Sequence, residues 1–308
     1  MFKFSQWKQE KTNQLNQESS VIQTALGPIE YCLEGNNNNP VVAIMHGAPG
    51  GFDQGLIEKD NLGTNGFRIL TWSRPGYLRT PLSTGKTFKE QAAALNSLIE
   101  SLKIPTISLI GISAGGVPAL FFAQDYPQKL SSLIMEVALS KEYTPSSFQL
   151  IVTKLFFNDF GLWIMNYLAK KRPQFMISFF MNVASSLDKK TRKKIIQNII
   201  KDTKQKSYFL KFLQSMSPMC NRKQGLYNDL SQYTHVEGLD ITQIKIPTLV
   251  IYGKYDTDVK PFYAHYMKEN MPCAKLYELK DGFHFFWFSD QFEDMEKEKI
   301  AFLKKHST

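Results

Sequence analysis

Short, continuous runs of apolar residues recur along this chain, and helical patterns separate them. The runs are VVAIM (41–45), FRILTW (67–72), TISLIG (106–111), LSSLIMEVA (130–138), TLVIYG (248–253) and AKLYEL (274–279). A strand that is buried on both faces of a parallel sheet has such a run, because neither face carries polar side chains. Helical spacing is clearest at 88–102, 117–126, 262–271 and 291–305. This alternation predicts an α/β fold with a mostly parallel central sheet flanked by helices.

Two segments depart from the alternation. Residues 1–20 are polar, and we expect a loosely attached helix or tail there; the next sixteen residues predict a hairpin of two short strands around Gly27 and Pro28. From about 140 to 235, apolar residues recur at helical spacing without a strand pattern. Residues 1–20 are therefore predicted to be a polar N-terminal segment. Residues 21–139 and 236–308 are predicted to form an α/β core, and residues 140–235 an inserted all-helical segment.

The net charge of +9 comes from one part of the chain. Residues 141–206 hold thirteen Lys or Arg against four Asp or Glu, so the remainder is neutral, and this segment is also rich in aromatic residues. Charge runs usually mark helices with a solvated basic face. The functional alternative is a surface that faces anionic lipid or an acidic partner. We do not expect a nucleic acid partner, because no known binding module accompanies the charge.

Cysteine use and the N-terminal sequence narrow the class of protein further. Cys32, Cys220 and Cys273 lie far apart in no metal-ligand spacing, and their odd number argues against a disulfide framework. The N-terminus has neither an apolar signal region nor a small-residue cleavage site. No run of about 18 apolar residues is present. We therefore expect a cytoplasmic globular protein without a spanning helix.

The segment GISAGG (111–116) carries the strongest sign of chemistry, because it lies between a predicted strand and a predicted helix. An ordinary turn also uses glycine and serine. However, Gly111 and Gly115 satisfy the pattern G-x-S-x-G of a nucleophile elbow around Ser113. Small flanking residues let the strained backbone pass, and the following helix N-terminus offers N–H donors for an oxyanion. Ser113 is therefore our predicted nucleophile.

A serine hydroxyl needs a base within hydrogen-bond reach and a third group that orients that base. Of the five histidines, His284 is the best candidate, because it directly follows the predicted strand 274–279, where a loop returns to the carboxyl edge of the sheet. The other four lie in a glycine-rich loop, a predicted helix, the end of the insertion and the terminal tail. A buried histidine with only a structural role is the alternative.

Three carboxylates are candidates for the orienting acid. Asp256 follows the strand 248–253 in YGKYDTD, Asp258 is close enough to compete, and Glu136 lies at the end of the preceding strand. A loop aspartate is more often a turn former than a catalytic residue. The order of Ser113, Asp256 and His284 nevertheless matches the nucleophile, acid and base order of one known fold. We therefore predict Asp256 as the acid.

HGAPGG (46–51) directly follows the predicted strand 41–45. Glycines after a buried strand leave room for backbone N–H groups to approach a ligand. The segment is either an ordinary glycine-rich turn or one half of an oxyanion hole, in which the amides of Ala48 and Ala114 are the donors. We expect His46 to organise this loop rather than to act as a base.

Five motifs in this order resemble those of the α/β-hydrolases with a helical cap, over residues 20 to 305. The motifs are HGAPGG, WSRPGY, GISAGG, GKYDTDVKP and GFH. The resemblance implies an α/β-hydrolase fold in which residues 140–235 form the cap. It favours Asp256 over Asp258, because the family pattern of the acid loop is G-x-x-D. The site residues that it implies are the nucleophile Ser113, the base His284, the acid Asp256 and the oxyanion donors Ala48 and Ala114.

Two features depart from the family. Phe283 stands directly before His284, where many members have glycine. The HG-x-PG loop is similar to that of proline iminopeptidases, but their elbow is usually GGSWG. Those enzymes tend to hold a substrate amine with acidic groups, which a cap of net charge +9 would repel. An aminopeptidase is therefore disfavoured, and Ser113 excludes the haloalkane dehalogenases, which use aspartate as the nucleophile.

The predicted function is a serine hydrolase that cleaves an ester-like acyl bond of a small, hydrophobic substrate through an acyl-enzyme, with no metal or organic cofactor. Phe156, Phe157 and Trp163 of the cap are predicted to bind the substrate, and plain helix packing is the alternative for each. Other aromatic residues that could roof the pocket are Tyr167, Phe175, Phe179 and Phe180.

Three other functions remain open from the sequence. An amidase or peptidase would use the same triad, because acyl transfer is identical at the nucleophile. A non-catalytic ligand receptor could use the same fold, since fold alone does not fix function. A peripheral lipase could dock its basic, aromatic cap on anionic lipid.

Overall fold

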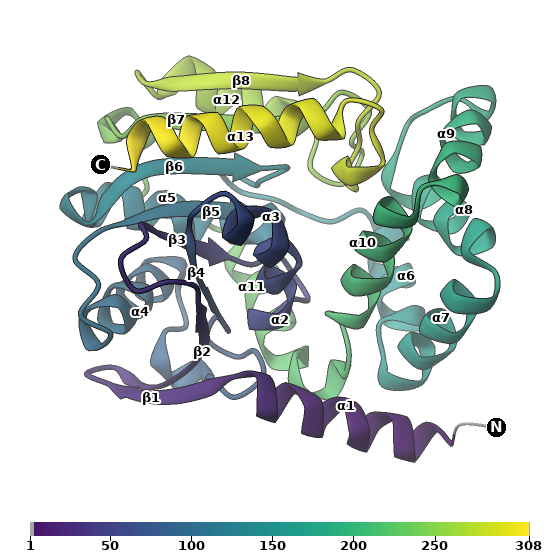
Figure 1. The fold of residues 1–308 in the computed structure, drawn as a ribbon, viewed down its shortest axis with the longest axis horizontal. Helices are drawn as coiled ribbons and strands as arrows, with labels where there is room; N and C mark the ends of the chain where they lie inside the picture. Colours follow the sequence, from purple (N-terminus) through teal and green to yellow (C-terminus); the bar gives the residue numbers. More distant parts are fainter. Residues whose placement is uncertain (1–2, 308) are drawn as a thin grey trace.

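The central element of the fold is an eight-stranded sheet in the order β1-β2-β4-β3-β5-β6-β7-β8 (Figure 1). The computed structural model describes residues 3–307. Strands β3 to β8 run parallel to one another. Strand β2 is antiparallel to both of its neighbours, β1 and β4. The strands are β1 (Ser20–Thr24), β2 (Gly27–Glu34), β3 (Val41–Met45), β4 (Arg68–Trp72), β5 (Ile107–Ile112), β6 (Leu130–Glu136), β7 (Thr248–Gly253) and β8 (Ala274–Leu279).

The continuous apolar runs are explained by burial on both faces of the sheet. In β3, Val42 and Ile44 pack into one hydrophobic cluster, whereas Ala43 and Met45 pack into a second cluster on the opposite face. The first face is covered by α3 and α13, and the second by α4, α5 and α12. These helices are α3 (Lys59–Thr64), α4 (Phe88–Ser101), α5 (Gly116–Asp125), α12 (Phe262–Asn270) and α13 (Phe292–His306). The predicted α/β fold with a mostly parallel sheet is confirmed.

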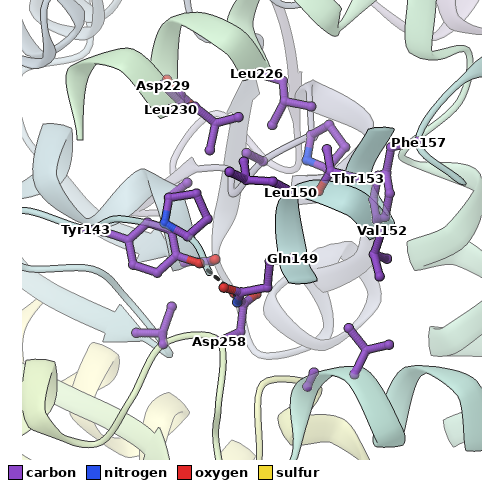
Figure 2. Close-up of a pocket in the computed structure, with 18 of the residues that line it drawn as sticks. Tyr143, Gln149, Leu150, Val152, Thr153, Phe157, Leu226, Asp229, Leu230 and Asp258 are labelled. Carbon is purple, nitrogen blue, oxygen red and sulfur yellow. Dashed lines mark hydrogen bonds between the residues drawn. The ribbon is translucent and has the colours of Figure 1, made fainter. Parts of the chain in front are cut away.

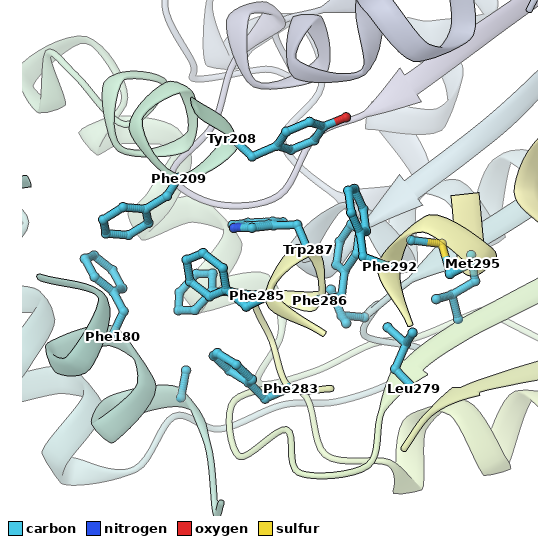
Figure 3. Packing of buried hydrophobic residues seen from close by; sticks show 14 of the residues in the cluster. Phe180, Tyr208, Phe209, Leu279, Phe283, Phe285, Phe286, Trp287, Phe292 and Met295 are labelled. Atoms are coloured by element: carbon cyan, nitrogen blue, oxygen red, sulfur yellow. The ribbon is translucent and has the colours of Figure 1, made fainter. Parts of the chain in front are cut away.

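Six α-helices lie between β6 and β7 and form a layer beside the carboxyl edge of the sheet (Figure 1). They are α6 (Ser147–Phe156), α7 (Asp159–Lys171), α8 (Pro173–Ala184), α9 (Lys189–Lys201), α10 (Thr203–Gln214) and α11 (Lys223–Gln232). Aromatic side chains join this layer to the loop after β8, where Phe180 of α8 and Phe209 of α10 pack near Phe285 and Phe288 (Figure 3). The expected helical segment is thus bound to the α/β core by an extended aromatic cluster.

Two ion pairs, both buried, also bind this helical layer to the core. Arg222 forms a two-pronged pair with Asp53, which lies in α2 (Phe52–Gly55). Arg74, after β4, forms a similar pair with Asp229 of α11. A bidentate guanidinium–carboxylate pair fixes the orientation of both partners. These pairs therefore fix the position of the helical layer relative to the loops that surround Ser113.

The N-terminal region differs from the expectation in two details. Helix α1 (Phe4–Glu18) is not loosely attached, because the Phe4 ring packs edge-on against the rings of Phe160 and Trp163 in α7, and Lys8 forms an ion pair with Asp159. The predicted hairpin is present, but Gly27 and Pro28 begin β2 instead of forming the turn. The turn lies at residues 25–26, because Thr24 pairs with Gly27 in the sheet.

Candidate active site

Ser113 lies at the sharp turn between β5 and α5. Its backbone adopts φ = +49°, a left-handed conformation that is rare for residues other than glycine and is strained. The flanking glycines are needed because the turn passes very close to its neighbours. A Cβ at Gly115 would overlap the carbonyl oxygen of Met45, and a Cβ at Gly111 would lie 2.8 Å from the Cβ of Ala119. Ser113 is thus held in an unusual conformation by residues that tolerate close packing.

Ser113, His284 and Asp256 form one hydrogen-bonded chain. The Oγ of Ser113 lies 3.2 Å from Nε2 of His284, and Nδ1 of His284 lies 3.0 Å from Oδ2 of Asp256. The other carboxylate oxygen, Oδ1 of Asp256, accepts hydrogen bonds from the amides of Asp258 and Val259. Since β5, β7 and β8 are parallel, the loops after them meet at the same edge of the sheet. The geometry is that of a nucleophile, a base and an orienting acid.

The electrostatic environment favours the protonated form of His284. Burial lowers the pKa of this imidazole, but the charges of Asp256 and Asp258 and the hydrogen bond with Asp256 outweigh that effect and raise its pKa to about 9. Oδ2 of Asp258 lies 3.6 Å from Nε2 of His284, on the side of the ring that also faces Ser113. A carboxylate near the imidazole favours an imidazolium, the species that forms when histidine takes a proton from serine.

The other two candidate acids have different partners. Oδ1 of Asp258 accepts hydrogen bonds from the hydroxyl of Tyr143 and from Nε2 of Gln149 (Figure 2). Glu136 is buried at the end of β6, where its Oε1 lies 3.0 Å from Nζ of Lys299. Only Asp256 contacts Nδ1, the nitrogen of His284 that points away from Ser113. This position makes Asp256 the carboxylate that can orient the ring.

The loop after β3 is organised by His46 and Arg74. Nε2 of the buried His46 accepts a hydrogen bond from the backbone amide of Arg74, and its Nδ1 lies 2.7 Å from the carbonyl oxygen of Gly47. Burial, together with the charge of Arg74, lowers the pKa of His46 well below its usual range, so this ring is neutral. Sequence reasoning missed the structural role of Arg74, although this residue lies in the WSRPGY motif.

Ala48 and Ala114 line the same cavity as Ser113. Ala114 directly follows the nucleophile at the N-terminal turn that leads into α5, where the first backbone N–H groups have no partner within a helix. Its carbonyl oxygen accepts a hydrogen bond from the hydroxyl of Tyr233, which fixes this peptide unit. The two alanines therefore lie beside Ser113, and their role as oxyanion donors stays a prediction.

Two cavities, of about 180 and 120 Å³, meet at Ser113. The larger one extends under α6, whose Gln149, Val152 and Thr153 point into it (Figure 2). The smaller one extends toward Tyr208 and Trp287. The residues that line both cavities are Ala48, Ser113, Phe157, Phe180, Asp258 and Phe285.

The predicted substrate-binding residues are only partly in this position. Phe157 lines both cavities. Phe156 and Trp163 line neither of them. Phe156 packs edge-on against Phe179, and Trp163 packs against Phe4 of α1, on another side of α7. The expectation for Phe156 and Trp163 is therefore corrected: helix packing, the alternative interpretation, describes both. Of the other aromatic candidates, Phe179 and Phe180 line the larger cavity, whereas Tyr167 and Phe175 are exposed on the outside.

The charge of the cavities is opposite to that of the cap segment. Within residues 3–307, no Lys or Arg lines either cavity, whereas Asp258 lines both and Glu58 lines the smaller one. The basic residues Lys171, Arg172 and Lys193 instead line a hollow on the outer side of α8 and α9. The sequence argument that a basic cap would repel a substrate amine therefore fails at the site, because net charge does not show where the charges lie.

The described residues show no candidate metal centre. In the part of the chain from 3 to 307, no group of three or more His, Cys, Asp or Glu side chains lies close enough together to hold a metal ion. In the same range, no helix is long and apolar enough to span a membrane.

Comparison with known proteins identifies the family. Residues 40–291 match the family model of the alpha/beta hydrolase fold. The chain belongs to the α/β-hydrolase fold family. It is 26% identical to an uncharacterized hydrolase, YcgS, of Bacillus subtilis over 287 residues, which cover 90% of this chain and 95% of that protein.

Two further similarities support a hydrolase. The chain is 24% identical to a 2-hydroxy-6-oxononadienedioate/2-hydroxy-6-oxononatrienedioate hydrolase of Burkholderia vietnamiensis, over 81% of this chain and 82% of that protein. Among solved structures, an alpha/beta hydrolase fold protein from Nakamurella multipartita is similar with a TM-score of 0.87 and 26% identity, over 93% of this chain and 99% of that one. This α/β-hydrolase is therefore similar to hydrolases over most of its length.

Proposed function

We propose that this α/β-hydrolase is a serine hydrolase that cleaves an ester-like acyl bond. The observation that carries the proposal is the chain of hydrogen bonds from Ser113 through His284 to Asp256, with distances of 3.2 and 3.0 Å. Each group lies within the reach that nucleophilic catalysis by serine requires. The strained backbone of Ser113 places this hydroxyl at the meeting point of two cavities.

The reaction follows from this geometry. Ser113 Oγ attacks the carbonyl carbon of the substrate while Nε2 of His284 takes the hydroxyl proton, and the carbonyl electron pair moves to oxygen. The amides of Ala48 and Ala114 stabilise this oxyanion. When the tetrahedral intermediate collapses, the bond to the leaving oxygen breaks and His284 gives its proton to the leaving alcohol. Water then attacks the acyl-enzyme by the same route, which releases the acid and restores Ser113.

The lining of the cavities favours an uncharged acyl substrate. Their walls are largely apolar, with Val152, Phe157 and Phe285 among the residues around Ser113. The Burkholderia relative is named for dioate substrates, which carry two carboxylates. Here, no Lys or Arg among the described residues lines either cavity to bind a carboxylate, and Asp258 would repel one. We therefore propose a neutral ester of small size as the substrate.

A fluorophosphonate probe tests the nucleophile directly. The purified protein is treated with the probe, and the adduct is located by peptide mass spectrometry, with the Ser113→Ala variant as control. Stoichiometric labelling at Ser113 is expected, followed by turnover in a graded series of p-nitrophenyl acyl esters. No labelling of a well-folded sample would contradict the proposal and favour a ligand receptor on a hydrolase fold.

One observation favours a second candidate, the hydrolysis of an amide or ester whose acyl part carries an amine. Asp258 lines both cavities, and no Lys or Arg within residues 3–307 pairs with it. A carboxylate that lies beside the reacting groups and has no Lys or Arg partner can bind a substrate ammonium. Aminoacyl p-nitroanilides and their N-acetylated counterparts distinguish the candidates: faster cleavage of the free amines would favour this second function.

A further inference from the structure

The cap carries a group of large apolar side chains that are exposed. Of the twelve large apolar side chains that are exposed among the described residues, eight lie between positions 150 and 175. The most exposed are Ile151 and Leu155 of α6, Tyr167 of α7 and Phe175 of α8, with exposed fractions of 56 to 62%. Scattered apolar residues on a surface are ordinary, but this concentration on three consecutive helices is not.

Helical spacing arranges these side chains in rows along their helices, and we call the rows together the stripe. Phe160, Ile164 and Tyr167 are spaced by four and three residues, so they share one side of α7. Ile151 and Leu155 have the same relation in α6. The end of α6 meets the start of α7, where the carbonyl of Phe156 packs directly against Gly161.

Basic residues lie beside this stripe, and we call the two together the outer cap face. The residues are Lys154, Lys170, Lys171 and Arg172, with Lys189 and Lys193 on α9. Within residues 3–307, none of these six forms an ion pair. The α7, α8 and α9 helices that carry most of them form the edge of the molecule away from the sheet (Figure 1). Part of the basic excess found in the sequence is therefore charge without an ion-pair partner among the described residues.

We propose that the outer cap face is a docking surface for a membrane that contains anionic lipid. Apolar side chains on the exposed face of a helix enter the boundary of the acyl chains, and neighbouring Lys and Arg bind the negative headgroups. A second copy of this chain fits less well, because it would bring Lys170, Lys171 and Arg172 against the same three residues. Charge complementarity thus selects an anionic lipid surface over a symmetric dimer.

The docking surface is directly connected to the candidate active site through α6. Val152, Thr153 and Gln149 line the larger cavity, whereas Ile151 and Leu155 of the same helix are exposed on the outer cap face. A docked cap would therefore bring the roof of the cavity to the lipid surface. Docking itself does not depend on hydrolysis, so it can be tested in a protein without the nucleophile.

The test is cosedimentation of the Ser113→Ala variant with vesicles of phosphatidylcholine, with and without phosphatidylglycerol. We expect binding to the anionic vesicles that weakens steadily as salt is added. Replacing Lys170, Lys171 and Arg172 by Gln should reduce the partition constant roughly a hundredfold. The Leu155→Ser and Phe160→Ser changes should each reduce it about tenfold, because each removes an apolar side chain from the lipid.

A matched control has the same loss of charge on the α/β core, by replacement of the exposed Lys245, Lys275 and Lys280 with Gln. This control is expected to bind nearly as the parent does. Equal loss in the control would overturn the proposal, since the net charge alone would then explain binding. Absent or salt-independent binding would also overturn it, as would a concentration-dependent dimer in analytical ultracentrifugation that Leu155→Ser and Phe160→Ser abolish. Fluorophosphonate labelling of Ser113 is measured on the parent protein, so a failure of docking and a failure of the proposed function are distinguishable.

Discussion

Two buried clusters of charge lie near the ends of neighbouring strands, and their partners differ. After β7, Asp256 faces His284, which in turn contacts Ser113 at the cavities. At the end of β6, Glu136 faces Lys299, whose ammonium is also bound by Glu58 and Glu296. Lys299 is fully buried, whereas His284 keeps part of its ring accessible, with 12% of its side chain exposed.

The difference in partners distinguishes the candidate active site at His284 from a structural charge cluster at Lys299. In both clusters a carboxylate is taken out of water, which is costly unless a partner compensates it. In the lysine cluster the cation is shared among three carboxylates, and among the described residues Lys299 lines neither cavity at Ser113, although Glu58 reaches the smaller one. The histidine cluster is open on one side, so its imidazole can exchange a proton with a bound substrate. Burial of a charged group therefore indicates a role in a reaction only when the group also contacts a cavity that can hold a substrate.

The largest expected effect is that of Ser113→Ala. Without the nucleophile no acyl-enzyme forms, so kcat should fall by about 10⁶ in steady-state assays with p-nitrophenyl esters. The thermal unfolding curve should remain close to that of the parent, because the variant removes a strained residue's hydroxyl and no packing. Retained turnover would show that another group is the nucleophile.

The next effect concerns the acid. Asp256→Asn should lower kcat by about 10⁴, because an asparagine at this position no longer stabilises the imidazolium or the correct tautomer of His284. The Asp258→Asn variant is the matched comparison, with the same chemical change two residues away, and its loss should be much smaller. If Asp258→Asn removed the activity and Asp256→Asn did not, the roles of the two carboxylates would be reversed.

The lysine cluster should affect stability rather than chemistry. Lys299→Met leaves Glu58, Glu136 and Glu296 buried without their cation and should cost about 3–5 kcal/mol in the free energy of unfolding, measured with urea. Lys297→Met on the exposed side of the same helix should change it by less than about 0.5 kcal/mol. Activity per folded molecule is expected to persist. A loss of kcat without a loss of stability would give the lysine cluster a part in the reaction.

The smallest expected effect is a change in pH dependence. Because the pKa of His284 is raised to about 9, kcat/KM should increase with pH until this base is deprotonated. The charge of Asp258 contributes to that shift, so Asp258→Asn should lower the pKa and move the rising limb to lower pH. The asparagine oxygen can still accept hydrogen bonds from Tyr143 and Gln149, which keeps the local geometry. An unchanged profile, as expected for the control Asp290→Asn, would show that Asp258 does not act on His284.

Local sequence determined most of the fold and the position of the nucleophile. Strands β3 to β7 are buried on both faces, so their apolar runs are visible without any knowledge of their neighbours. The glycines around Ser113 are visible for the same reason, since the turn that they permit is a local property of the backbone. A hairpin turn is less strictly encoded, and the Gly27-Pro28 pair begins a strand instead.

Only the tertiary structure decided which side chains meet. Asp256, Asp258 and Glu136 were all reasonable partners for a histidine in the sequence, because the identity of a carboxylate does not show what it faces. The meeting of the loops after β7 and β8 brought Asp256 to His284, and the packing of α13 on the sheet brought Lys299 to Glu136. The same limit applies to Trp163, which packs on α1, and to the basic residues of the cap, which lie outside the cavities. Long-range contacts depend on how distant segments pack, and no local pattern of residues encodes them alone.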